Sequence, residues 1–277
     1  MEPPGSSPAL RMVSFNMRKG LGDHFSWGGM ERLEDALKGE SPDLVLLQEV
    51  YHPHSETGWG QGERLAAHLG MHLAYSPNNS TPRGHYGNAT LSRFPLTVFT
   101  NYNISTNRIE RRGALYTRVE VNRCPLHLIN THFGLNQRQR KVQVGLLREV
   151  IQSHVAPGSP VIVAGDFNDW SGRLRHTIQA QWPLTDALAA LSRRQRLTWH
   201  SRLPLFPLDH LYFGGLDLQQ VQVAAASAWR GLSDHLPVVA QFTAPLGHWQ
   251  PAPDGTQTWQ SSAPPAQSAA HTIPQAG

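Results

Sequence analysis

The sequence has little cysteine, no long apolar run and no large excess of charge. A single cysteine, Cys124, excludes an internal disulfide and fits a reducing compartment. No apolar stretch approaches the ~20 residues that cross a bilayer. Residues 1–8 lack the basic and apolar regions of a signal peptide. We therefore expect a cytoplasmic protein without stable membrane insertion.

Length and composition set the scale of the molecule. With 277 residues and 39% hydrophobic content, the chain can bury the core of one α/β domain or of two small ones. The formal charge of +4 favours anionic partners only mildly. Residues 244–277 are rich in Pro, Ala, Gln and Ser, a composition typical of disorder. We expect a flexible leader (1–9), one domain (10–243) and a disordered tail (244–277).

Apolar runs and their periodicities predict strands that alternate with helices. The predicted strands cover 10–16, 43–49, a run that stops before Pro95, 114–121, 126–131, 161–164, 209–213, 219–225 and 236–242. The predicted helices cover 30–40, 62–69, 138–155 and 184–191. This mixture of elements predicts an α/β fold.

The segment Val161–Trp170 is the most informative one. Its apolar run ends at Gly165, and Asp166 and Asn168 follow. Side chains two positions apart in an extended segment point the same way. A carboxylate beside an amide suits a hard cation, a water or a phosphate oxygen. An Asx turn is the alternative interpretation of the same residues.

Other polar side chains also stand where strands begin or end. Asn16, Glu49 and His132 close apolar strands, whereas Asp209, Asp234 and His235 precede them. Taken alone, Asn16 is more typical of a turn, Glu49 could equally reach solvent at the sheet rim, and a pair such as Asp234-His235 is often turn material. In antiparallel packing, however, the end of one strand lies beside the start of its neighbour, so one rim of a sandwich can collect all of them. Asp234 and His235 would then form a ready acid/base couple.

Three further residues are candidates for substrate contacts. Arg18 follows the first strand, Asn88 lies in a Gly-spaced turn that enters a strand, and Arg140 lies near the start of the longest helix. Arginines suit phosphate, and Asn88 could line a cleft. Solvated charges and ordinary turn chemistry explain the same three residues equally well.

The ordered series of motifs resembles the endonuclease/exonuclease/phosphatase superfamily, which includes deoxyribonuclease I-like nucleases, AP endonucleases, neutral sphingomyelinases and inositol-polyphosphate phosphatases. The resemblance covers residues 10 to about 243 and is strongest to small, uncharacterised bacterial members. It implies a four-layer α/β sandwich, with two mixed β-sheets packed face to face and helices outside. The motifs that carry it are Ser14-Phe15-Asn16, Gln48-Glu49, Asn130-Thr131-His132, Gly165-Asp166-Phe167-Asn168, Leu208-Asp209 and Ser233-Asp234-His235.

The resemblance also implies a metal site. Glu49 corresponds to the main Mg²⁺ ligand, with Asn16 and Asp234 close to the metal or its waters. Mn²⁺ is an alternative occupant. Mg²⁺ takes few protein ligands and keeps several waters, which suits one glutamate helped by an amide and an aspartate.

The catalytic roles are likewise implied by the resemblance. His235 corresponds to the histidine that meets the scissile phosphate, oriented by Asp209. Asp166 corresponds to the group that orients or deprotonates the attacking water, and Asn168 to a binder of a phosphate oxygen. His132 matches the deoxyribonuclease, sphingomyelinase and phosphatase branch, since AP endonucleases carry a tyrosine there.

These expectations define a monomeric Mg²⁺-dependent phosphoesterase acting on a phosphodiester or phosphomonoester. A lipid head group or small phosphoester is favoured over nucleic acid, because basic residues are scattered rather than gathered in long loops. A nuclease is the first alternative. A non-catalytic phosphate-binding module is the second, disfavoured because no matched catalytic position is substituted. His210 stands where the bacterial relatives commonly carry arginine, which leaves substrate contacts there open.

Overall fold

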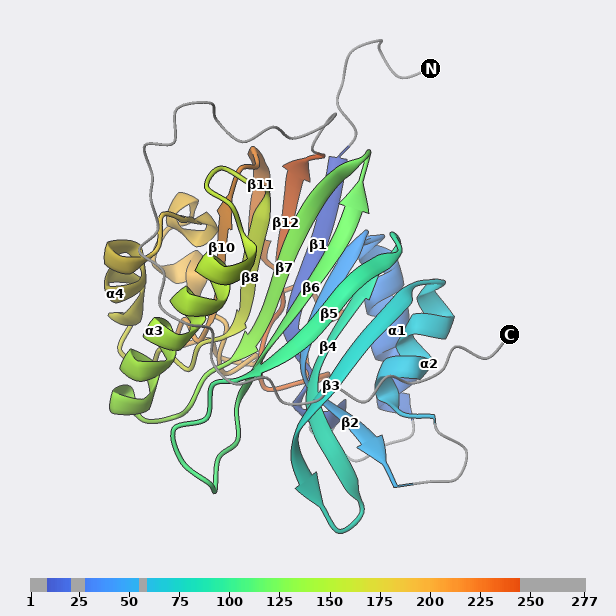
Figure 1. Ribbon diagram of the computed structural model, residues 1–277. Helices are drawn as coiled ribbons and strands as arrows, with labels where there is room; N and C mark the ends of the chain where they lie inside the picture. Colours follow the sequence, from blue (N-terminus) through green and yellow to red (C-terminus); the bar gives the residue numbers. More distant parts are fainter. Residues whose placement is uncertain (1–8, 21–27, 55–58, 245–277) are drawn as a thin grey trace.

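The computed structural model describes residues 9–20, 28–54 and 59–244. These residues form two six-stranded mixed sheets packed face to face, with helices on the two outer sides (Figure 1). The four-layer α/β sandwich implied by the motifs is therefore confirmed. The predicted tail lies outside the described residues apart from Ala244, as does the predicted leader apart from Ala9.

The first sheet has the strand order β11-β12-β1-β2-β4-β3. Only β1 and β2 pair in parallel in this sheet. Its strands are β1 (Ala9–Asn16), β2 (Leu44–Pro53), β3 (His72–Thr81), β4 (Gly84–Ser92), β11 (Leu218–Val223) and β12 (Val238–Thr243).

The second sheet has the order β5-β6-β7-β8-β10-β9. Its single parallel pair is β7 with β8. Its strands are β5 (Leu96–Asn103), β6 (Gly113–Val121), β7 (Cys124–His132), β8 (Val161–Asp166), β9 (Thr185–Asp186) and β10 (Asp209–Gly214).

Helices cover the outer face of each sheet (Figure 1). The first sheet packs against α1 (Gly28–Glu40) and α2 (Gln61–Leu69). The second packs against α3 (Gln137–His154) and α4 (Leu174–Gln181). In the described part of the chain, no helix is long and apolar enough to cross a membrane.

Strand alternation decides which side chains enter which layer. On β8, Ile162 and Ala164 join the core between the sheets, whereas Val161 and Val163 face the helices. Both faces are covered, so the strand is continuously apolar. Because the side-chain period is two, Asp166 continues the inter-sheet face at the end of the strand. The same rule puts the polar ends of the neighbouring strands on this face.

Two long strands and one α-helix were absent from the sequence prediction, and one predicted helix was wrong. The strands β3 and β5 and the helix α4 were not predicted. Residues 184–191 were predicted as a helix but form β9, paired to β10, and then a 3₁₀ turn at Ala187–Ala190. Asp186 ends the strand, because its side chain accepts a hydrogen bond from Leu188 N.

His127 provides a test of how burial affects stability. Burial, and then the nearby Arg118, lower the pKa of His127 to about 4. The unfolded chain, with an ordinary pKa near 6.5, therefore binds a proton that the native state excludes, and stability falls as pH drops from about 6.5 toward 4. Between pH 7.5 and pH 5, urea unfolding should show a loss about 2 kcal/mol larger in the wild type than in His127→Gln. The exposed His176→Gln is the control, and an unchanged pH slope in His127→Gln would contradict the assignment.

Candidate active site

The sandwich brings the predicted strand-end residues to one rim of the inter-sheet layer. In the second sheet, His132 is opposite Asp166 across the parallel pair, and Asp209 is opposite Asp166 across the antiparallel pair. The segment before β12 reaches the same place, because Ser233 Oγ donates a 2.7 Å hydrogen bond to the carbonyl oxygen of Asn16.

Asp166 is the hub of this arrangement. Its side chain is 2% exposed. Asn16 Nδ2 donates to Asp166 Oδ2 over 2.9 Å, and the backbone N–H of Asn168 donates to Asp166 Oδ1 over 2.8 Å. The Nε2 atoms of His132 and His235 lie 3.3 and 3.8 Å from the same Oδ2. A buried carboxylate needs such donors to offset its lost hydration.

His235 and Asp209 form a direct pair. His235 Nδ1 lies 2.8 Å from Asp209 Oδ2, and both side chains are buried. Nδ1 is therefore the donor, and Nε2 faces the carboxylate of Asp166. This geometry fixes the imidazole ring and aims one N–H into the centre of the site.

Burial and neighbouring charges shift the pKa values of the two histidines and of Asp166. Burial lowers the pKa of His235, but the Asp209 and Asp166 carboxylates outweigh it and raise that pKa to about 10. Burial, followed by Asp209, raises the pKa of Asp166 to about 6 even though His235 opposes the shift. Burial and then Arg112 hold the pKa of His132 well below its usual range. At neutral pH the centre therefore holds an imidazolium, a neutral imidazole and a carboxylate able to accept a proton.

The predicted metal ligands lie at this rim. Asn16 and Asp234 are joined through Ser233, whose Oγ contacts both the Asn16 carbonyl and Asp234 Oδ1. Glu49 follows Gln48, the partner of Asn16 in the parallel pair of β1 and β2. Within the described residues, the side chain of Glu49 forms neither a hydrogen bond nor an ion pair, so its half-buried carboxylate fits a cation.

A β-bulge directs Glu49. The register of β2 against β4 shifts between Leu47 and Val50, and Glu49 has a left-handed backbone with φ 55°. Strict alternation would put Glu49 with Leu47 and Val45 on the helix side of the sheet. The bulge breaks that alternation. The negative charge of Glu49 also raises the pKa of Tyr86, second to burial, which brings the carboxylate close to the phenol on β4.

A second acidic group offers ligand atoms for a metal. Atoms of Asp166, Asp209 and His235 lie within 4.8 Å of one another. His235, however, already uses Nδ1 on Asp209, and its raised pKa favours the protonated form, which cannot ligate a metal. The trio and Glu49 are therefore two separate groups of side chains that could hold a cation, and the assignment of the metal to Glu49 stays a prediction.

Asn168 is held in a special conformation. Its backbone is left-handed with φ 49°, and Nδ2 donates to the Phe133 carbonyl over 2.9 Å. The left-handed turn lets the Asn168 N–H reach back to Asp166. Strained backbone of this kind is retained where the surroundings over-determine it.

The three predicted substrate-contact residues have different surroundings. Arg18 is exposed, with Nε 3.7 Å from Asp234 Oδ2. Asn88 is buried, and Nδ2 donates to the carbonyls of Gly113 and Asn130 while Oδ1 has no partner. Arg140 is 4% exposed and donates to the Leu135 carbonyl. Their role toward substrate stays a prediction, and for Arg140 these contacts describe a structural side chain.

Sequence reasoning did not select several residues that shape the site. Gln48 Nε2 donates to Asn130 Oδ1 over 2.8 Å and joins the two sheets below the rim. Arg112 Nη1 lies 3.4 Å from His132 Nδ1. Lys19 Nζ lies 4.2 Å above the Tyr86 ring. Gln48 and Asn130 belong to two of the motifs that carry the family resemblance, but no role was predicted for them. Their polarity within apolar strands is the signal that could have identified them.

Comparison with known proteins agrees with this geometry. The profile of the Endonuclease/Exonuclease/phosphatase family matches residues 13–235. The chain is 32% identical over 244 residues to the uncharacterized protein YbhP of Escherichia coli (strain K12), covering 84% of this chain and 96% of YbhP. The chain therefore belongs to the Endonuclease/Exonuclease/phosphatase family. Members of this superfamily of phosphoesterases and nucleases are generally hydrolases and typically depend on a divalent metal.

Solved structures share the fold at low sequence identity. The endonuclease/exonuclease/phosphatase from Beutenbergia cavernae has a TM-score of 0.72 and 19% identity, covering 85% of this chain and 72% of that one. The human Nocturnin catalytic domain, solved with a bound sulfate anion, has a TM-score of 0.68 and 21% identity, covering 86% and 96%. Both likenesses concern the architecture.

Gly165 tests how closely β7 and β8 must approach. It has φ 150°, and a Cβ there would lie 1.9 Å from the Thr131 carbonyl oxygen. Gly165→Ala should therefore lower the free energy of unfolding by about 3 kcal/mol through overpacking and backbone strain. Urea unfolding measures the loss. Gly145→Ala on α3 is the matched control, because a Cβ there meets nothing within 4 Å. A Gly165→Ala protein as stable as the wild type would show that the strands can separate freely.

Proposed function

We propose that the protein is a metal-dependent phosphoric ester hydrolase that uses a water molecule as the nucleophile. The observation that carries the proposal is the buried Asp166, flanked by His235 paired to Asp209 and by Asn16 and Asn168. Phosphoester hydrolysis needs a positioned water, a proton acceptor and positive charge on the phosphoryl oxygens. The rim supplies side chains for each of these requirements.

Separate side chains accept the proton of the water and stabilise the charge of the phosphoryl group. Asp166, with its pKa raised to about 6, accepts the proton of the attacking water. The His235 imidazolium, held by Asp209, hydrogen-bonds a phosphoryl oxygen and balances its charge. Asn168 and the neutral His132 both lie against the Asp166 carboxylate, beside the position of the attacking water.

A divalent cation, held by Glu49 with Asn16 and Asp234, would polarise the phosphoryl group and stabilise its developing charge. Mg²⁺ suits an oxygen-only donor set of this size, and Mn²⁺ would fit the same ligands. The unpartnered Glu49 carboxylate supports this assignment.

For the substrate, we propose a lipid head group or another small phosphoester. Nucleic acid is the second candidate, and one observation favours it: Trp199 Nε1 donates to Asp234 Oδ2 over 3.3 Å, which places an indole beside the proposed metal ligand. Bases stack on such rings.

A panel of substrates decides between the two classes. The purified protein with Mg²⁺ is offered a phosphodiester and a phosphomonoester of small molecules, phospholipid vesicles, and single- and double-stranded oligonucleotides. We expect turnover of at least one small phosphoester. Turnover of oligonucleotides alone would move the assignment to the nuclease, and no turnover of any substrate would favour the non-catalytic binding module.

Glu49→Gln tests the metal assignment. The amide keeps the size of the side chain but removes the charge that binds the cation, so Mg²⁺-dependent turnover should vanish while the melting temperature is unchanged. Titration calorimetry with Mn²⁺ should show the same loss without needing turnover. Glu120→Gln, on an exposed position of β6, is the control. Hydrolysis that persists in Glu49→Gln and in the presence of EDTA would contradict the metal assignment.

A double-mutant cycle tests the pair of His235 and Asp209. Removing the imidazole should lower kcat about 10²–10⁴-fold, the range for an acid/base or charge-stabilising group. Asp209→Asn should also be severe. The double variant should be little worse than the worse single one, because residues that act as a unit are not additive. His72→Ala, exposed on β3, is the control. Fully multiplicative losses, or a near-normal His235→Ala, would rule out the coupled pair.

A further inference from the structure

A cavity of about 440 Å³ lies on the side of β10 away from the inter-sheet core. The loop after β8, the segment 193–197 and the residues before β10 form its walls. Side chains alternate along β10, so His210 enters this cavity while Asp209, one position earlier, faces the catalytic rim. A volume of this size is in the range of small-molecule sites. We call it the arginine pocket.

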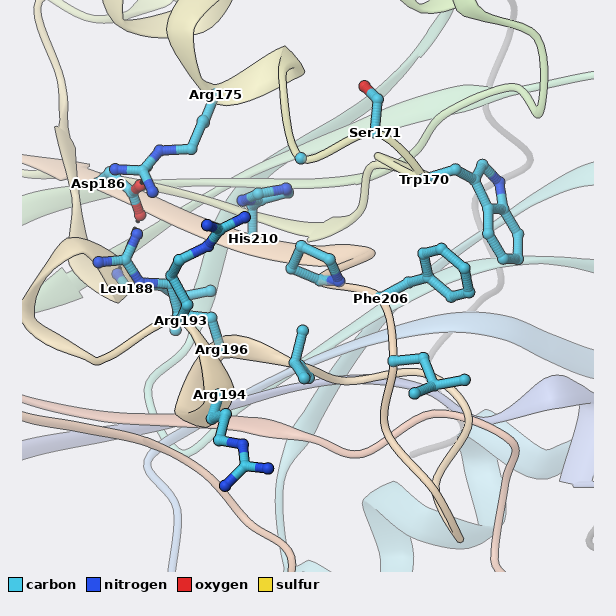
Figure 2. A pocket seen from close by; sticks show the side chains of 14 residues that line it. Trp170, Ser171, Arg175, Asp186, Leu188, Arg193, Arg194, Arg196, Phe206 and His210 are labelled. Carbon is cyan, nitrogen blue, oxygen red and sulfur yellow. Dashed lines mark hydrogen bonds and ion pairs between the residues drawn. The ribbon is translucent and has the colours of Figure 1, made fainter.

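Positive charge dominates one side of the arginine pocket. Figure 2 shows Arg175, Arg193 and Arg196 near Asp186 on one side, and the lining also includes Arg194, whose side chain extends away from this group. Arg196 is anchored, because Nε donates to the Leu191 carbonyl and Nη2 to that of Ala189. Burial lowers the pKa of Arg196, and the charges of Arg175 and Arg193 lower it further while Asp186 opposes them. The positive charges of Arg175, Arg193 and Arg196 thus repel one another, and an anion bound between them would relieve this repulsion further than Asp186 does.

The buried wall of the arginine pocket also has unused hydrogen-bonding capacity. His210 is 4% exposed, yet neither ring nitrogen has a hydrogen-bond partner among the described residues. Its Nε2 faces Asp169 Oδ2 over 3.7 Å, and although burial opposes the shift, this interaction helps to lower the pKa of Asp169. Arg175 Nε is buried and likewise without a hydrogen bond, 3.7 Å from Asp186 Oδ2. Buried polar atoms are normally satisfied, so His210 Nδ1 and Arg175 Nε point to a missing partner.

The opposite side of the arginine pocket is aromatic and connects to the catalytic rim. Trp170 and Phe206 form this side (Figure 2), with ring centroids 5.3 Å apart. Trp170 also packs edge-on against Trp199 at 5.0 Å, and Trp199 hydrogen-bonds Asp234. One aromatic cluster thus borders both the arginine pocket and the proposed metal ligands.

We propose that the arginine pocket binds a phosphate group other than the scissile one, held by the arginines and by His210. Guanidinium groups bind phosphate through paired, charge-assisted hydrogen bonds. The phosphate belongs either to a second position of the substrate or to a free polyphosphate anion. The substrate version rests on the proposed function, whereas the binding site itself does not.

Binding of inorganic pyrophosphate tests the pocket without turnover. Titration calorimetry is done in EDTA with the wild type, His235→Ala, Arg193→Gln/Arg194→Gln and the control Arg123→Gln/Arg148→Gln. Both pairs remove two exposed charges, but the control pair lies away from the pocket. We expect one site per chain, weakened about tenfold or more by Arg193→Gln/Arg194→Gln alone. Equal weakening by both arginine pairs, unchanged binding in Arg193→Gln/Arg194→Gln, or loss of binding in His235→Ala would overturn the proposal.

Kinetics then distinguish the two sources of the phosphate. Two substrates that differ only in a second phosphate group are compared in the wild type and in Arg193→Gln/Arg194→Gln. A KM that rises about tenfold more for the bisphosphorylated substrate assigns the pocket to the substrate. Equal changes for both substrates, with pyrophosphate binding lost, assign it to a free anion. An inactive enzyme would refute the proposed function and leave the calorimetric result standing.

Discussion

Burial of the Asp166 carboxylate is the constraint on which the polar centre depends. A carboxylate removed from water is costly unless donors surround it. Asn16, Asn168 and His235 supply donors from three separate segments, and strand pairing fixes each segment in place. The centre therefore exists only when both sheets have formed and docked. The same loss of hydration raises the pKa of Asp166. The burial that disfavours folding therefore also makes the carboxylate a better proton acceptor.

The two sheets are matched in register by a polar bridge above an apolar core. Gln48 Nε2 donates to Asn130 Oδ1, and Asn130 Nδ2 donates across to the carbonyls of Leu47 and Ala89. Apolar packing alone tolerates sliding, whereas buried hydrogen bonds are lost if the sheets shift. The Leu47 carbonyl that accepts from Asn130 lies at the start of the β-bulge that contains Glu49. Docking of the sheets and placement of Glu49, the predicted metal ligand, thus depend on neighbouring contacts.

Prediction from sequence succeeded where apolar patterning was strong. The strands β1, β2, β7 and β8 are apolar on both faces because layers cover both, and their polar ends mark the rim. The polar strand β3 was missed because only three of its ten residues are buried and its apolar pattern is short. The predicted helix at 184–191 was wrong, since pairing of Asp186 with Tyr212 on β10 overrides the local preference of a short segment.

The sequence by itself determined which polar residues stand at the ends of strands and that Asp166 and His132 continue one face of their strands. It also determined the family resemblance. These are local properties, because they depend on a period of two and on short motifs. Only the tertiary structure decided the direction of Glu49, the burial of Arg140 and the meeting of Arg175 with Arg193 at one cavity. These features arise where segments distant in the chain come together. Which loops meet, and which donors then lack partners, depends on the packing of layers that no local pattern encodes.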